Sequence, residues 1–186
     1  MDKNDSALED LLNRRTFSLL AISLGVLTTV LSIGCSPRYV RGTEIKYTVD
    51  KQDVANLVER YRIALERRDI DTLRTLAHQN YFENGSTTTE PADDYDYNGL
   101  QKVLADLQNK VKAVKYEIEI KDIQFIGNLA RVDYTYRSQY LLVNGERDRW
   151  SSHADKNRIT FQRVPKGKKV QLADGTQVRW RILAGM

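Results

Sequence analysis

The sequence predicts an α+β domain in which three N-terminal helices pack on a curved, mostly antiparallel sheet. Apolar residues recur at helical spacing up to about residue 111, and from residue 114 they alternate with polar residues instead. Turns that contain glycine and asparagine separate the alternating segments, as in a meander of antiparallel strands. Because the helices precede the strands in the chain, they are expected to cover one face of the sheet.

Three helices are expected in the first part of the domain, which we place at residues 50–186. Asp50 is positioned to cap the first helix, and Asp69 precedes the second. Asn98, with Gln101 three residues later, fits a capping pair for the third helix. Apolar side chains that share helical spacing, and are therefore expected to face inward, are Val54, Leu57, Val58, Tyr61, Ala64, Leu65, Leu73, Leu76, Leu100, Val103, Leu104, Leu107 and Val111.

A meander of four or five strands is expected after the helices. The first strand begins near Val114, and a Gly-Asn turn at 127–128 leads to the second. Asn-Gly at 144–145 is a strong hairpin signal before a third strand at 150–164, and Asp-Gly at 174–175 is another before the last strand. Side chains of one parity, expected to face the helices, are Val114, Tyr116, Ile118, Ile120, Ala130, Val132, Tyr134, Tyr136, Ser138, Tyr140, Ile159, Phe161, Val178, Trp180 and Ile182.

The third strand leaves one alternative open. Alternation back from Ile159 and Phe161 brings His153 and Asp155 to the inward face, where they could act as an acid–base pair. Trp150 has the opposite parity. If Trp150 packs inward, a bulge must separate it from His153, which would then turn outward. The residues alone favour a solvent-exposed strand end.

An apolar segment precedes the domain. Residues 17–34 carry no charge, and Arg14 and Arg15 lie just before them, which is the pattern of an export signal. The segment ends at Cys35, the one cysteine of the sequence, so the domain can form no internal disulfide. Residues 36–49 show little periodicity and are expected to form a tether.

Residues 1–35 resemble the leader of a bacterial lipoprotein. A small residue, Gly34, precedes Cys35 at the end of the apolar segment, although Ser32 stands where the family usually has leucine. The resemblance implies that Cys35 is diacylated, which supplies the two chains that stable anchoring needs. With Ser36 after the cysteine, it also implies the outer membrane, facing the periplasm. The alternatives are an uncleaved spanning anchor with Cys35 unmodified, and a buried core helix.

The domain resembles the nuclear transport factor 2-like superfamily, a cone-shaped, cystatin-like fold shared by ketosteroid isomerases, scytalone dehydratase and polyketide cyclases. The resemblance rests on the order of elements and on residues 61–76, 81–82 and 179–183. It implies a sheet that curls around a pocket, where the enzymes place a carboxylate or histidine as acid or base. The superfamily also contains binding modules, so the resemblance leaves function open.

The expected inward face is apolar and aromatic. Candidate pocket residues are Tyr61, Tyr116, Tyr134, Tyr136, Trp150 and Trp180. Apart from His153 and Asp155, no inward strand position carries a histidine or carboxylate, which argues against catalysis. We therefore expect a non-catalytic envelope domain that binds a small hydrophobic ligand or an envelope protein. The alternatives are an isomerase-, dehydratase- or cyclase-type enzyme that uses His153 and Asp155 on a small hydrophobic substrate, and a purely structural envelope protein.

Composition and motifs exclude other classes of function. The 29 basic and 25 acidic residues are interleaved along most of the chain. Only Lys166, Lys168 and Lys169 form a dense basic cluster, and they lie at an expected turn, so nucleic acid is not an expected partner. No phosphate loop, nucleophile elbow or zinc spacing occurs, and neither a cofactor nor a metal is predicted.

Overall fold

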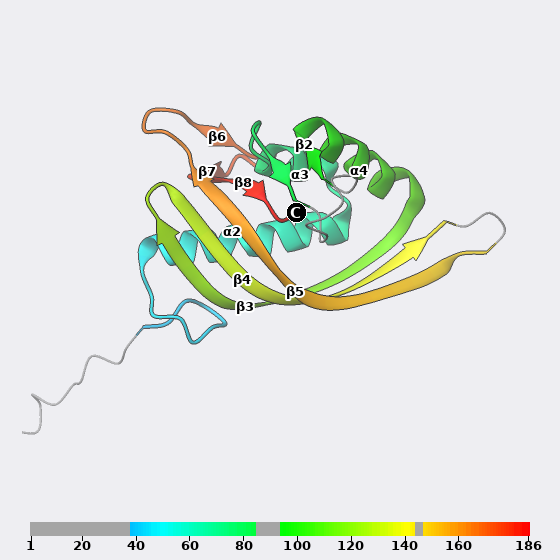
Figure 1. Ribbon diagram of the computed structural model, residues 1–186, viewed down its shortest axis with the longest axis horizontal. Helices are drawn as coiled ribbons and strands as arrows, with labels where there is room; N and C mark the ends of the chain where they lie inside the picture. Colours follow the sequence, from blue (N-terminus) through cyan, green and yellow to red (C-terminus); the bar gives the residue numbers. More distant parts are fainter. Residues whose placement is uncertain (1–37, 85–93, 144–146) are drawn as a thin grey trace, which may run out of the picture. The chain divides into compact units, whose positions relative to one another are not determined.

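Three helices lie on the concave side of a curved antiparallel sheet in a computed structural model, which describes residues 38–84, 94–143 and 147–186 (Figure 1). The α+β architecture predicted from the sequence is confirmed. The helices are α2 (Val49–Arg67), α3 (Ile70–Leu76) and α4 (Tyr97–Lys110). The strands are β1 (Phe82–Glu83), β2 (Tyr95–Asp96), β3 (Val111–Ile126), β4 (Leu129–Leu142), β5 (Arg149–Arg163), β6 (Val170–Gln171), β7 (Gln177–Val178) and β8 (Trp180–Ala184).

The main sheet has the strand order β3-β4-β5-β8, and every neighbouring pair is antiparallel. Two small two-stranded sheets, β1–β2 and β6–β7, accompany it. The β6–β7 hairpin closes at the predicted Asp-Gly turn, where the Gly175 N–H donates to the Leu172 carbonyl. Pairing of residues 82–83 with 95–96 was not predicted, since both segments are too short to show a period.

Two helix caps differ from the predicted ones. The Thr48 hydroxyl, rather than Asp50, caps α2 by accepting from the Lys51 N–H at 3.1 Å. Asp50 lies in the first turn and pairs with Arg163 of β5. Asp96, rather than Asn98, caps α4. In both helices the true cap lies two residues before the expected one, and the same short polar residue types serve at either position.

The inward stripe of α4 is narrower than predicted. Leu100, Leu104 and Leu107 are buried, whereas Val103 is 47% exposed. Val111 does not belong to the helix, because β3 begins there. A β-branched residue at this point favours the extended backbone that follows.

The side chains of β3 that face the helices are even-numbered from Val114 to Ile120 and odd-numbered beyond it. A register shift lies between Ile120 and Asp122, and beyond it Ile123 is the buried residue. No such shift occurs between β4 and β5, which pair without interruption from Leu129–Gln162 to Leu142–Arg149. The bulge that would have turned Trp150 inward is therefore absent, and Trp150 lies on the convex face.

The last residues are tied to the segment that follows α3. The Gly185 N–H donates to the Glu83 carboxylate at 2.6 Å, and the Met186 N–H donates to the Tyr81 hydroxyl at 3.1 Å. That hydroxyl in turn donates to Glu83. Tyr81 is 1% exposed and stacks on Tyr95, with ring centroids 6.1 Å apart. These contacts attach the residues that follow β8 to residues 81–83.

Part of the segment predicted as a tether packs on the domain. Val40 is 1% exposed, and its N–H donates to the Ile45 carbonyl at 2.8 Å. A second hydrogen bond joins the Tyr47 N–H to the Arg38 carbonyl. The folded unit therefore includes residues 38–47 in addition to the expected 50–186.

The predicted leader, with the apolar segment 17–34 and Cys35, lies outside the described residues. Among the helices that the structure does describe, none has the length and apolarity needed to cross a membrane.

Candidate functional site

A row of tyrosine rings in contact with one another lies between α2 and the helix-facing side of the sheet. We call it the tyrosine face: Tyr61 of α2, Tyr116 of β3, and Tyr134 and Tyr136 of β4. The Tyr61 and Tyr116 rings meet edge to face at 6.2 Å. The Tyr116 and Tyr136 rings stack at 5.4 Å, with 10° between their planes. Tyr134 and Tyr136 lie 6.0 Å apart. Alternate strand residues share a face, and diagonal neighbours on adjacent strands come within ring contact, so this arrangement confirms the predicted parity.

Glu66 of α2 fixes the strand position of Tyr116. One carboxylate oxygen of Glu66 accepts from the Tyr116 N–H at 3.0 Å, and the other accepts from Arg62 at 2.6 Å. Arg62 also approaches the Tyr116 carbonyl at 3.4 Å. The helix therefore occupies the outer edge of β3 at this point and supplies its missing hydrogen-bond partners.

Three of the four tyrosines are buried, and the fourth is not. Tyr61, Tyr116 and Tyr134 are 4%, 5% and 1% exposed, whereas Tyr136 is only partly buried. Burial raises the pKa of Tyr61 well above its ordinary value and that of Tyr134 to about 12, so both hydroxyls stay protonated at neutral pH. The Tyr116 hydroxyl and the Asn157 side chain lower the pKa of Tyr134 to a smaller extent.

The Tyr134 hydroxyl is the unusual group of this face. It is buried, and although the Tyr116 hydroxyl and the Asn157 side chain lie near enough to lower its pKa, neither is in hydrogen-bond geometry with it. Tyr136 and Asn157 adjoin it on the side where the row reaches solvent.

His153 and Asp155 lie at the outer end of the row, with the inward parity that alternation predicted. They pair with Ser138 and Tyr136 of β4, and the His153 ring lies 5.8 Å from that of Tyr136. Their side chains are 63% and 65% exposed, and His153 Nε2 lies 3.9 Å from Asp155 Oδ2. That distance is too long for a hydrogen bond. The solvent-exposed strand end favoured from the residues is what the structure shows.

The two tryptophans do not join the tyrosine face. Trp150 is 47% exposed on the convex side, where the Lys115 ammonium lies 5.5 Å from its ring centroid. Trp180 is fully buried in the core, between the Phe125 ring at 5.6 Å and the Arg163 guanidinium at 4.3 Å. Of the six predicted pocket residues, the structure thus brings the four tyrosines together.

His78, the other histidine of the sequence, has a structural role. Its Nδ1 accepts from the Asn80 N–H at 3.0 Å, and its own backbone N–H donates to the Ile182 carbonyl at 2.7 Å. Burial and the nearby Arg181 lower the pKa of His78. It therefore joins α3 to β8 rather than facing the tyrosines.

The sequence did not predict a hollow that is lined by α2 and the β6–β7 hairpin. It has a volume of about 970 Å³. Arg60 closes one end by donating to Asp174 at 2.7 Å and to Thr176 at 3.1 Å. The Thr176 backbone N–H and then Arg60 hold the pKa of Asp174 at about 2. Arg179 pairs with Asp53 beside it. These contacts join residues more than a hundred positions apart, and Asp-Gly at 174–175 was the only local signal for them.

Apart from the tyrosines, few polar side chains are withdrawn from water. In the described ranges, Ser138 is the one buried side chain that is neither apolar nor a tyrosine. These ranges also hold no group of three or more histidine, cysteine or acidic residues close enough to bind a metal.

Comparison with solved structures identifies the fold. The chain is similar to a conserved protein from Planctomyces limnophilus DSM 3776, with a TM-score of 0.56 and 12% identity over 73% of this chain and 92% of that chain. A nuclear transport factor 2-like superfamily protein from Salmonella enterica serovar Typhimurium LT2 gives 0.56 and 11%, over 73% and 87%. A candidate scytalone dehydratase from Novosphingobium aromaticivorans DSM 12444 gives 0.54 and 14%, over 74% and 81%.

The domain therefore has the nuclear transport factor 2-like fold that the sequence resemblance implied. The sequence matches no family model and no curated protein. At these identities the likeness shows the fold alone, since this fold carries both enzymes and binding domains.

Proposed function

We propose that the domain is a non-catalytic binding module for a small, planar, hydrophobic ligand, which it receives on the tyrosine face. The observation that supports this most directly is the continuous row of rings from the buried Tyr116 to the partly exposed Tyr136 and the exposed His153. Stacked rings that reach solvent offer a flat apolar surface to another ring. The neighbouring Tyr134 hydroxyl, which lacks a partner among the described residues, would gain one from a polar group on the ligand.

The alternative enzymatic function is less well supported by the same face. Acid–base catalysts are usually groups whose surroundings shift their pKa toward the working pH. His153 and Asp155 are mostly exposed and too far apart for a hydrogen bond. The candidate dehydratase among the structural neighbours shares the fold at 14% identity, which does not carry over its activity.

Binding to the tyrosine face is expected to depend on Tyr136 and not on Trp150. Calorimetric titration of the full chain with 2-naphthol should show at least a tenfold loss of affinity for Tyr136→Ala, because stacking contributes about 0.5–1.5 kcal/mol in addition to buried area. Trp150→Ala is the matched control, since it removes an exposed aromatic ring from the opposite face of the same sheet. Equal losses in both variants, or no binding of 2-naphthol by the wild type, would contradict the proposal.

We further propose that residues 1–35 export the protein and that a lipid on Cys35 anchors it in the outer membrane, facing the periplasm. The uncharged segment 17–34, the preceding Arg14 and Arg15, and the small residue before Cys35 support this proposal. Two acyl chains bind a membrane stably where one binds it only marginally.

Cys35→Ala is expected to abolish incorporation of radiolabelled palmitate, and Ser36→Ala, which keeps the thiol, is expected to retain it. Cells that express each full-length variant would be labelled, fractionated and compared on gels. Equal labelling of wild type and Cys35→Ala would disprove lipid attachment at this residue. Membrane association without any label would instead support the uncleaved anchor.

A further inference from the structure

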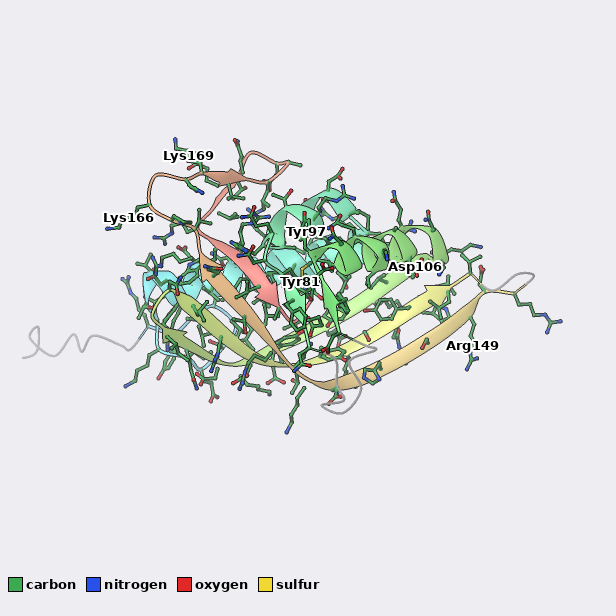
Figure 2. All side chains as sticks on the ribbon, turned by 45° about the horizontal axis from the view of Figure 1, so that its top comes forward. Tyr81, Tyr97, Asp106, Arg149, Lys166 and Lys169 are labelled. Atoms are coloured by element: carbon green, nitrogen blue, oxygen red, sulfur yellow. The ribbon has the colours of Figure 1, made fainter. Side chains whose placement is uncertain are left out.

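Most of β5 forms an open edge of the main sheet. Strand β8 pairs with β5 only at Thr160–Arg163, and Gly185 then lies against the backbone of Arg158 and Ile159. Residues 149–157 have β4 on one side and no strand among the described residues on the other. Figure 2 shows Arg149 at the far end of this stretch, away from β8. The opposite edge of the sheet differs, because Glu66 and Arg62 of α2 cover β3 at Tyr116.

The backbone groups of even-numbered residues point toward the open edge. The Arg163 N–H donates to Asn128, on the β4 side, whereas the Val164 N–H donates to Arg179, on the β8 side. Extending this alternation along the strand directs the N–H and C=O groups of Ser152, Ala154 and Lys156 outward.

Two of the outward amides hydrogen-bond to the side chain of the preceding residue. The Lys156 N–H donates to Asp155 Oδ1, and the Arg158 N–H donates to Asn157 Oδ1, both at 2.7 Å. Such local bonds substitute for ladder hydrogen bonds where no strand is present. An edge of this length whose amides lack strand partners is a template for another strand.

We propose that this edge pairs antiparallel with β5 of a second copy of this chain, about a two-fold axis at Ala154. Pairing about residue 154 joins residues 151–157 of the two copies, which avoids both β8 and the chain end at Gly185. Ala154 then hydrogen-bonds with its own counterpart, and Ser152 with Lys156 of the second copy. This is an isologous interface, in which each copy contributes the same surface.

The side chains that face each other in this register are complementary. On the concave face His153 lies opposite Asp155 of the second copy, at a non-hydrogen-bonded position where paired Cα atoms are about 4.5 Å apart. This pairing occurs twice because of the symmetry, and an imidazole N–H can donate to a carboxylate directly across the ladder.

Neighbouring registers are less favourable. Moving the axis to residue 153 places Asp155 opposite Ser151 and separates it from His153, and moving it to residue 155 places the Asp155 carboxylate opposite itself. Like charges directly opposite each other destabilise a strand pair. The sequence of β5 therefore selects Ala154 as the centre. Strand pairing alone buries little apolar area, so we expect concentration-dependent association rather than a permanent dimer.

Disulfide mapping tests both the pairing and its register. In the full chain with Cys35→Ser, Ala154→Cys is expected to cross-link to itself on mild oxidation. Residues at a symmetric hydrogen-bonded position have Cα atoms about 5.5 Å apart, within the disulfide range of roughly 4.4–6.8 Å. Ser152→Cys, in the same background, is the matched control. Its counterparts lie roughly 13 Å apart along the strand, so it should not cross-link.

A second pair of variants tests the backbone bonds. Ala154→Pro removes the outward N–H at the axis and leaves the bonds to β4 in place, a substitution that edge strands tolerate. Sedimentation of the full chain in non-ionic detergent should show the wild type and Ala154→Ser associating with rising concentration, and Ala154→Pro associating at least tenfold more weakly. Circular dichroism would verify that Ala154→Pro is folded.

The proposal is overturned if residues 152 and 154 cross-link equally, if neither cross-links, or if a folded Ala154→Pro chain associates as strongly as the wild type. A wild-type domain that stays monomeric at every concentration would also overturn it. Because none of these variants replaces a residue of the tyrosine face, cross-linking and association are measured separately from 2-naphthol binding, and either proposal can fail without the other.

Discussion

Gly185→Ala is expected to lower the free energy of unfolding by about 3 kcal/mol or more, as strain and overpacking each contribute about 1–3 kcal/mol. Gly185 has φ +89°, and a Cβ there would lie 2.0 Å from the Arg158 carbonyl oxygen and 2.9 Å from its carbonyl carbon. Both are backbone atoms of β5, which cannot rotate away as a side-chain tip can. The Gly185 N–H also donates to Glu83, so a shift of this residue loses that bond as well.

Gly167→Ala separates the effect of backbone strain from that of the steric contact with Arg158. Gly167 has φ +86°, nearly the same backbone conformation, but no atom lies within 4 Å of the position that its Cβ would take. Its substitution should lower stability by about 1 kcal/mol, from backbone strain alone. Urea unfolding followed by circular dichroism would compare the two variants with the wild type. Equal effects would mean that the contact with Arg158 does not restrict the chain end.

Trp180→Ala is expected to destabilise the protein by about 3–5 kcal/mol, the usual effect of truncating a large buried aromatic residue. Trp180 is fully buried on β8 and contacts Phe125 of β3 and Arg163 of β5. Alanine would leave a cavity where β8 packs against side chains of β3 and β5, and these strands cannot close around it without losing their register.

Trp150→Ala provides the comparison for Trp180→Ala. Trp150 is 47% exposed on the convex face and contacts the Lys115 ammonium. Its truncation in the monomer should lower stability by less than about 1 kcal/mol, since exposed cation–π pairs contribute about 0.5–1 kcal/mol. Thermal and urea unfolding at low protein concentration would measure both variants. A large loss for Trp150→Ala at low concentration would contradict its placement on a solvated face.

Local signals predicted the elements well and their ends less well. The helical stripe ending at Leu65 and the alternation from Val114 to Tyr136 match α2, β3 and β4. The caps at Thr48 and Asp96 were missed, because several neighbouring polar residues can accept the same orphan N–H groups. Which of them does so depends on how the preceding chain enters the helix.

For the candidate site, local signals likewise predicted the face on which each side chain lies but not how deeply it is buried. Parity placed Tyr116, Tyr134 and Tyr136 on one face, as the structure has them, and also placed His153 and Asp155 there. Parity alone does not give the depth of a position. β5 extends beyond the part of the sheet that β8 pairs with, so its first half is exposed on both faces.

The periods of 3.6 and 2 in the apolar residues were enough to establish the α+β class, the order of helices and strands, and the face on which the tyrosines lie. Pairing over long distances established the rest: the hollow between α2 and β6–β7, the burial of Trp180, and the open edge of β5. Periodicity is a property of neighbouring residues along the chain, whereas burial and strand partnership depend on residues that folding brings in from far away.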